Sequence, residues 1–189
     1  MAIWVAYALL TLAIATIVFS QHLARKHRDK WFHDQVILDI SAKGIDIEAQ
    51  RCYDWEEAVV SRRFTQLGMD GLMNETEAQV FADKLSKAFG FDTPRVTISD
   101  FNGQPITGVS VDGHRIIVRK QTDLLVMTHE LTHCFLYQDG HRAEAHSRNF
   151  IHCYIDLLEY IGVTDIRHTV HAWAVDTTPN EPSLGFVPK

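Results

Sequence analysis

Cysteine is scarce in this sequence, and its three copies are widely separated. Cys52, Cys134 and Cys153 are odd in number and form no CxxC pair. That pattern argues against a disulfide framework and against a zinc site built from cysteines, and it suits a reducing compartment. Cys134 and Cys153 lie within apolar helical patterns, where we expect them to be small core residues.

An excess of positive charge is also lacking. The chain carries 18 Lys and Arg against 24 Asp and Glu, a formal net charge of −6. Residues 21–30 hold four basic residues and one acidic residue, which leaves 14 and 23, or −9, for residues 31–189. A domain this acidic lacks the electrostatic surface of a nucleic-acid binder, so no nucleic-acid partner is expected.

Charged side chains are absent from the first 20 residues. As a helix, residues 2–20 would span about 28 Å, enough for the hydrocarbon core of a bilayer. A cleaved signal peptide would need basic residues before a shorter apolar run, whereas Arg25, Lys26, Arg28 and Lys30 follow this one. We predict a transmembrane anchor at residues 1–20, a basic juxtamembrane connector at 21–45, and a cytoplasmic domain beyond them.

Local signals predict an α+β domain over residues 46–175. Residues 46–63 contain no Gly or Pro and favour a helix. Asn74 and Glu77 can cap a second helix, which ends at Gly90. A further short helix is expected after Thr164, and residues 176–189, with three prolines, are expected to form an extended tail.

Three short β-branched runs predict a small, mainly antiparallel sheet at residues 95–98, 108–111 and 114–118. Asp112 and Gly113 separate the last two runs, a strong hairpin signal. His114 follows this turn directly and is expected to face solvent.

The chemistry of the chain is concentrated in the stretch HELTH, residues 129–133. Residues four apart on a helix lie about 6 Å apart on one face, so His129 and His133 can offer two imidazoles to one metal ion. Glu130 lies one step round the helix, where its carboxylate can serve as the general base of a zinc hydrolase. The surrounding helix is apolar, and burying these groups there would be costly without a function. We therefore predict one Zn²⁺ per chain at this helix.

A third protein ligand must come from another segment. The metzincin pattern is excluded, because Leu136 and Asp139 stand where it requires Gly and His. Peptide deformylase takes an upstream cysteine from a local motif that Cys52 lacks. The downstream candidates are His141, Glu144, His146, His152 and Glu159. His146 is best placed, because it follows a turn at Gly140 and lies at a helix start; His141 and Glu144 are the alternatives.

HELTH followed by HSRNF at residues 146–150 resembles the SprT-like group of small zincins. More closely, the run QRCYDWE at residues 50–56, then PRVTI, HELTH and HSRNF-x3-YIDLLE, is similar to predicted metallohydrolases of actinobacteria and their phages. The similarity covers roughly residues 48–175. It implies a minimal zincin fold with His129, His133 and His146 as metal ligands and Glu130 as base. Ser147 stands where that family usually has glycine, and serine is a good N-cap.

Other polar residues near the motifs have less defined roles. Tyr137 and Tyr154 could stabilise an oxyanion, although core packing is the simpler expectation. Asp139 and Glu144 could orient a ligand histidine. His152, His168 and His171 are expected at the surface or behind the ligands.

Together these patterns predict a membrane-anchored zinc metallohydrolase, most simply a peptidase acting on an unidentified peptide or protein. A DNA-dependent protease of the SprT type fits poorly with the anchor and the acidic domain. The alternative is a metal-stabilised, membrane-tethered binding protein without turnover.

Overall fold

The structure is a computed structural model of the chain, and it describes residues 15–23, 47–101, 106–141, 146–172 and 188. The chain divides into two compact units, Met1–Gly44 and Ile45–Lys189. In the first unit, residues 15–23 are helical and exposed. Within the described ranges, no helix is both long and apolar enough to cross a membrane. The predicted anchor, connector and tail lie mostly outside the described residues and stay predictions.

A continuous helical stretch opens the second unit, as predicted. Helix α2 (Ile47–Trp55) passes through a π-helical turn (Glu56–Val60) into α3 (Ser61–Leu67), which Gly68 ends with a φ of 67°. The absence of Gly and Pro predicted a helix here but gave no sign of the π-helical turn. Such turns occur mostly as single insertions in α-helices, frequently at functional sites. This one begins at Glu56, a buried acidic residue.

Helix α4 (Glu75–Phe89) follows the predicted signals closely. The Asn74 side chain accepts a hydrogen bond from the Glu77 amide, and the Glu77 carboxylate accepts one from the Asn74 amide. This capping box satisfies two amides that the first turn leaves without helical partners. Gly90, with a φ of 76°, ends the helix.

Strands β1 (Arg95–Ile98), β2 (Gly108–Val111) and β3 (Arg115–Val118) form one sheet in the order β1-β3-β2. β3 pairs antiparallel with β2 but parallel with β1. The sheet is therefore mixed, and the prediction of a mainly antiparallel sheet was wrong. Its strands were predicted correctly, but alternating apolar residues do not reveal that the third strand inserts between the first two.

The β2–β3 hairpin forms at the predicted Asp-Gly pair. Asp112 and Gly113 have φ values of 52° and 70°, the left-handed pair that a type I′ turn requires. Val111 pairs with Arg115, so His114 belongs to the turn rather than to the strand. The His114 side chain is exposed, as predicted.

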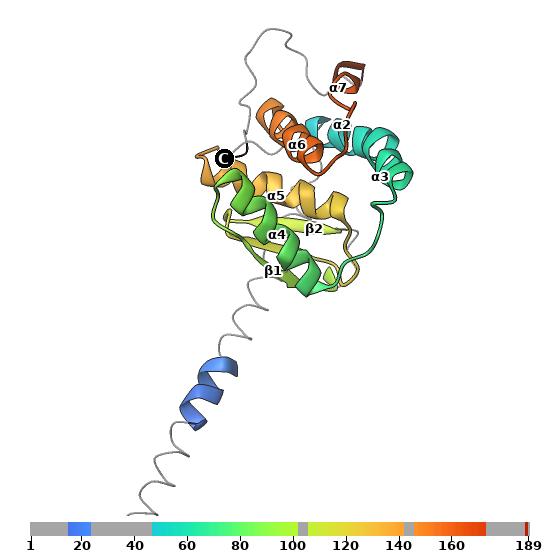
Figure 1. Cartoon of the computed structure of the whole chain (residues 1–189). Coiled ribbons are helices and arrows are strands. Elements are labelled where there is room, and N and C mark those ends of the chain that lie inside the picture. Colours follow the sequence, from blue (N-terminus) through green and yellow to red (C-terminus); the bar gives the residue numbers. More distant parts are fainter. Residues whose placement is uncertain (1–14, 24–46, 102–105, 142–145, 173–187, 189) are drawn as a thin grey trace, which may run out of the picture. The chain divides into compact units, whose positions relative to one another are not determined.

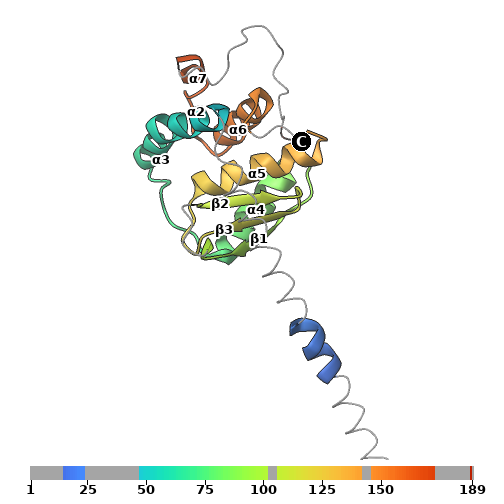
Figure 2. The same ribbon diagram turned by 180° about the vertical axis from the view of Figure 1, so that it is seen from behind.

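Helix α5 (Leu124–Gln138) lies between the sheet and α6 (Arg148–Tyr160), as Figures 1 and 2 show. Helices α4 and α5 cover the same face of the sheet, α4 over β1 and α5 over β2 and β3. The short helix expected after Thr164 is α7 (Thr169–Ala172), which begins five residues later, so Thr164 does not cap it. The Thr164 hydroxyl lies instead beside the Asp165 carboxylate.

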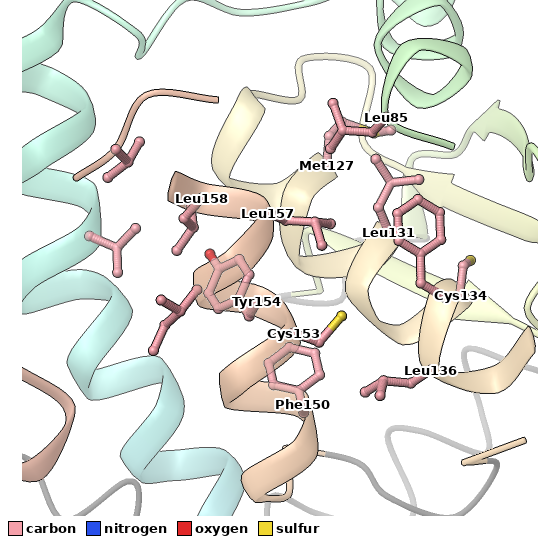
Figure 3. Close-up of a cluster of buried hydrophobic side chains, with 14 of the residues drawn as sticks. Leu85, Met127, Leu131, Cys134, Leu136, Phe150, Cys153, Tyr154, Leu157 and Leu158 are labelled. Atoms are coloured by element: carbon pink, nitrogen blue, oxygen red, sulfur yellow. The ribbon is translucent and has the colours of Figure 1, made fainter. Parts of the chain in front are cut away.

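The hydrophobic core is continuous around α5. Leu131 and Cys134 of α5 share one buried cluster with Phe150 and Cys153 of α6, shown in Figure 3. Because both its faces are covered, α5 is largely buried, as its apolar sequence predicted. Polar side chains on this helix must therefore find partners inside the protein.

Candidate metal centre

Helix α5 begins where the Asp123 side chain accepts a hydrogen bond from the Val126 amide at 2.9 Å. Its two buried threonines bond within the helix: Thr128 donates to the carbonyl of Leu124, and Thr132 donates to that of Thr128. These local bonds satisfy both hydroxyl donors. The remaining interior polar groups are those of the predicted site, and they contact other segments.

The imidazole rings of His129, His133 and His146 converge. Nε2 of His129 lies 3.3 Å from Nε2 of His133 and 3.1 Å from Nε2 of His146. In a tetrahedral site with Zn–N bonds of about 2.0–2.1 Å, two ligand nitrogens would lie about 3.3 Å apart. Both separations from His129 therefore match those of nitrogens that share one metal ion.

The Glu56 carboxylate defines which nitrogen of His129 is available. Oε1 of Glu56 lies 2.8 Å from Nδ1 of His129, and both side chains are buried. Donation from Nδ1–H to this carboxylate leaves the Nε2 lone pair facing the other two rings. Burial lowers the pKa of His129, but the charge and hydrogen bond of Glu56 outweigh it and raise the pKa. A metal ion would replace the proton that this arrangement attracts to Nε2.

His133 has the opposite electrostatic balance. Burial, together with the charges of His129 and His146, holds the pKa of His133 well below its ordinary value. Its ring therefore stays neutral, the protonation state that a metal ligand needs.

Glu130 is buried beside this cluster, with 7% of its surface exposed. Burial and the charge of Glu56 raise its pKa to about 7, against the opposing effects of His129 and the Ser110 amide. Its carboxylate packs closely on β2, because a Cβ added to Gly108 would lie 3.0 Å from Oε1 of Glu130. Glycine at this position lets the strand approach the carboxylate.

Two aromatic rings enclose the histidines. Phe150 of α6 contacts all three, with ring centroids 4.4–4.9 Å apart. Tyr53 of α2 stacks on His129 at 5.6 Å and meets His146 edge-on at 5.0 Å. Tyr53 is 39% exposed, so the site lies close to solvent on the α2 side and is closed by the core on the α6 side.

Cys52 also belongs to this cluster. Its thiol and one ligand atom each of His129 and His146 all lie within 4.8 Å of one another, a group that could hold a metal ion. Cys52 is fully buried, and burial and the charge of Glu56 raise the pKa of its thiol. The sequence argued against a zinc site built from cysteines, and this group contains one cysteine beside two histidines.

His146 holds its place at a backbone cost. Its φ is 51°, a left-handed conformation that non-glycine residues rarely adopt. The next residue, Ser147, is the predicted N-cap of α6, and its hydroxyl accepts a hydrogen bond from the Phe150 amide at 3.4 Å. Residues in such conformations cluster at functional sites, where the surroundings enforce the conformation.

The other candidates have different surroundings. Tyr137 packs against the hairpin turn, since a Cβ at Gly113 would lie 2.5 Å from its ring. Tyr154 lies nearer the site: its buried ring is 5.6 Å from that of His129, and burial and the Glu56 charge raise its pKa well above the ordinary value.

The remaining predicted polar residues pair with nearby side chains or lie at the surface. His141 lies 3.8 Å from Asp139, His152 bonds Arg148, Glu159 pairs with Arg167, and His168 is exposed. Glu144 and the side chain of His171 lie outside the described residues.

Sequence reasoning missed the roles of Cys52, Tyr53 and Glu56 at this site. All three lie on α2 or its π-helical turn, about 70 residues before α5. Helix periodicity cannot reveal such a contact. The one available signal was their position in the run at residues 50–56 that carries part of the resemblance.

Comparison with known proteins adds no further constraint. No family model matches the chain, and neither a curated protein nor a solved structure matches it.

Proposed function

We propose that this protein is a zinc-dependent hydrolase, most simply a peptidase, in which His129, His133 and His146 hold the metal ion. The observation that carries the proposal is that Nε2 of His129 lies 3.1 Å from that of His146 and 3.3 Å from that of His133, with the buried Glu130 next in the chain. Three protein ligands leave one tetrahedral position for water or substrate, the arrangement of a catalytic rather than a structural zinc.

Zinc is the favoured ion because of the donor set. Imidazole nitrogens suit zinc, whereas calcium and magnesium prefer oxygen ligands. When bound, the ion supplies a Lewis acid that activates water and polarises a carbonyl group. The Glu56 carboxylate would orient His129 by accepting a hydrogen bond from its Nδ1–H, a contact that supports ligand histidines in many metal sites.

Glu130 is the proposed general base. Its carboxylate would take a proton from the attacking water and pass it to the leaving nitrogen of the peptide bond. Without a metal ion, burial raises the pKa of this carboxyl group to about 7. A cation on the three histidines would lower this pKa again and favour the carboxylate.

We also propose that the chain is anchored in a membrane, with this domain in the cytoplasm. The support is in the sequence: the uncharged run at residues 2–20 and the four basic residues that follow it. Protease digestion of intact cells tests this orientation. The domain should resist digestion until the cells are opened, and digestion from outside would contradict it.

The test of the proposed function uses full-length protein in detergent and a diverse peptide library. Cleavage should occur, stop with a chelator and return when zinc is added. Zinc binding without any cleavage would favour the alternative, a metal-stabilised binding protein. Cleavage that persists after removal of bound metal would contradict the metal-dependent chemistry.

A further inference from the structure

The three-histidine site has a fourth metal-ligating neighbour, the thiol of Cys52. We propose that Cys52 is a metal ligand in the resting protein, closing the position that water or substrate would need. The inference rests on the proposed function, because it concerns how the same metal site is regulated.

The position of Cys52 separates it from the two other cysteines. All three are buried, but among the described residues only the thiol of Cys52 falls in a group of convergent metal-ligating atoms, with His129 and His146. Cys134 instead has its sulfur 3.4 Å from the Ser110 hydroxyl, on the sheet side of α5. Cys153 lies on α6 within the apolar core.

The sulfur of Cys52 lies within 4.8 Å of one ring nitrogen each of His129 and His146. With Zn–S bonds of about 2.3 Å and Zn–N bonds of about 2.05 Å, a tetrahedral site would separate sulfur from nitrogen by about 3.6 Å. The separations of the Cys52 sulfur from these two nitrogens therefore exceed this value by at most about 1.2 Å. Rotation of a cysteine between staggered rotamers moves its sulfur by roughly 3 Å. The distance that remains is therefore within the range of a side-chain rotation of Cys52.

The donor set is chemically consistent. Thiolate and imidazole are the ligands that zinc takes in closed four-ligand sites. Coordination forms a sulfur–metal bond and breaks the S–H bond, and the proton passes to solvent. Because Cys52 lies four residues before Glu56, one turn of α2 and its π-helical continuation would carry both a ligand and the carboxylate that orients His129.

A consequence for activity follows. With four protein ligands the site cannot bind a water, so Cys52 must leave the metal before Glu130 can act on one. The resting protein would be a closed form, and movement of α2 away from α5 would open it. On this account, Cys52→Ala should hydrolyse peptides faster than the wild type.

Cobalt(II) substitution tests the ligand directly. Full-length wild type, Cys52→Ser and the matched control Cys134→Ser are loaded with one cobalt ion per chain. A thiolate ligand adds a near-ultraviolet charge-transfer band, whereas imidazoles alone give only weak visible bands. We expect the band in the wild type and in Cys134→Ser, and its loss in Cys52→Ser with the visible bands retained.

The other outcomes distinguish failure of Cys52 as a ligand from failure of the metal site itself. Visible cobalt bands without the charge-transfer band in the wild type would overturn the role of Cys52 but leave the three-histidine site standing. A charge-transfer band that survives in Cys52→Ser would also overturn it. If the wild type binds no cobalt, the metal site itself is wrong, and the proposed function fails with it.

A second measurement covers the case in which Cys52→Ser does not fold. X-ray absorption of the zinc-loaded wild type counts sulfur ligands without any substitution. One sulfur at about 2.3 Å supports the proposal, and a shell of light atoms alone contradicts it.

Discussion

Two helices of equal length, α4 and α5, follow different rules in this protein. Each has 15 residues and packs on the same sheet. Helix α4 has a capping box, a buried stripe that includes Leu85 and Phe89, and an opposite face where Val80 is 56% exposed. These features of α4 all stabilise the helix or its packing on the sheet, and none requires a further function.

Helix α5 instead buries groups that stability alone does not favour. His129 and Glu130 are 5% and 7% exposed. The charge of Glu56, from another segment, acts on both of them. Burying such groups is costly unless they are paired. The comparison shows that tertiary contacts hold the polar groups of α5, which the HExxH pattern by itself does not reveal. Substitutions on the two helices should therefore have effects of different kinds.

The largest effect is expected at Glu130. Replacement by Gln preserves the shape but removes the base, so turnover should fall at least ~100-fold while zinc content and folding persist. The matched control is Glu77→Gln on α4, which should leave turnover unchanged. Peptide cleavage assays measure the turnover of both variants and of the wild type. Equal cleavage by wild type and Glu130→Gln would remove Glu130 from the mechanism.

Loss of the Glu56 carboxylate should weaken zinc binding. Partners of ligand histidines typically contribute about 10–100-fold to metal affinity, so Glu56→Ala should raise the zinc dissociation constant by that factor. Glu57→Ala is the control, because Glu57 is the neighbouring exposed carboxylate. Competition with a zinc-binding dye measures both. Unchanged affinity in Glu56→Ala would show that the 2.8 Å contact with His129 does not tune the site.

An intermediate effect is expected where β2 meets the site. A methyl group at Gly108 would lie 2.8 Å from Cγ1 of Val126 and 3.0 Å from the Glu130 carboxylate. Gly108→Ala should cost about 1–3 kcal/mol through overpacking and also reduce turnover. Gly71→Ala, which meets nothing within 4 Å, is the matched control. Urea unfolding measures the stability of both variants. Equal stabilities would contradict the close approach of Gly108 to Val126 and Glu130.

The smallest effect belongs to α4. Asn74→Ala removes the side chain that caps the helix and should cost ~1 kcal/mol of unfolding free energy. Zinc content should not change, because the contacts of Asn74 are local. Thermal unfolding and metal analysis of the same sample test both parts. Zinc loss in Asn74→Ala would mean that α4 and the site are coupled after all.

The local features of the fold could be predicted from the sequence. Capping at Asn74 and Ser147, the Asp112–Gly113 turn and the buried helix around HELTH each depend on neighbouring residues, and each is present. The insertion of β3 between β1 and β2 depends on long-range pairing, so no local pattern could predict it. The π-helical turn at Glu56 is likewise unmarked in the sequence.

The candidate site divides in the same way. The i, i+4 spacing placed His129 and His133 on one helical face, and the turn before α6 singled out His146; all three rings now lie together. The partners on α2 could not be found by spacing, because they approach across the fold. The argument against cysteine depended on the lack of a local pair, and it does not apply to Cys52, which meets the histidines through tertiary packing.

Zinc stoichiometry tests the central claim, that the buried polar face of α5 together with His146 binds a metal ion. Metal analysis of the purified full-length protein should give close to one zinc per chain. His146→Ala should lose most of it, whereas the control His114→Ala, at an exposed turn residue, should keep it. Full zinc content in His146→Ala, or no zinc in the wild type, would contradict the account.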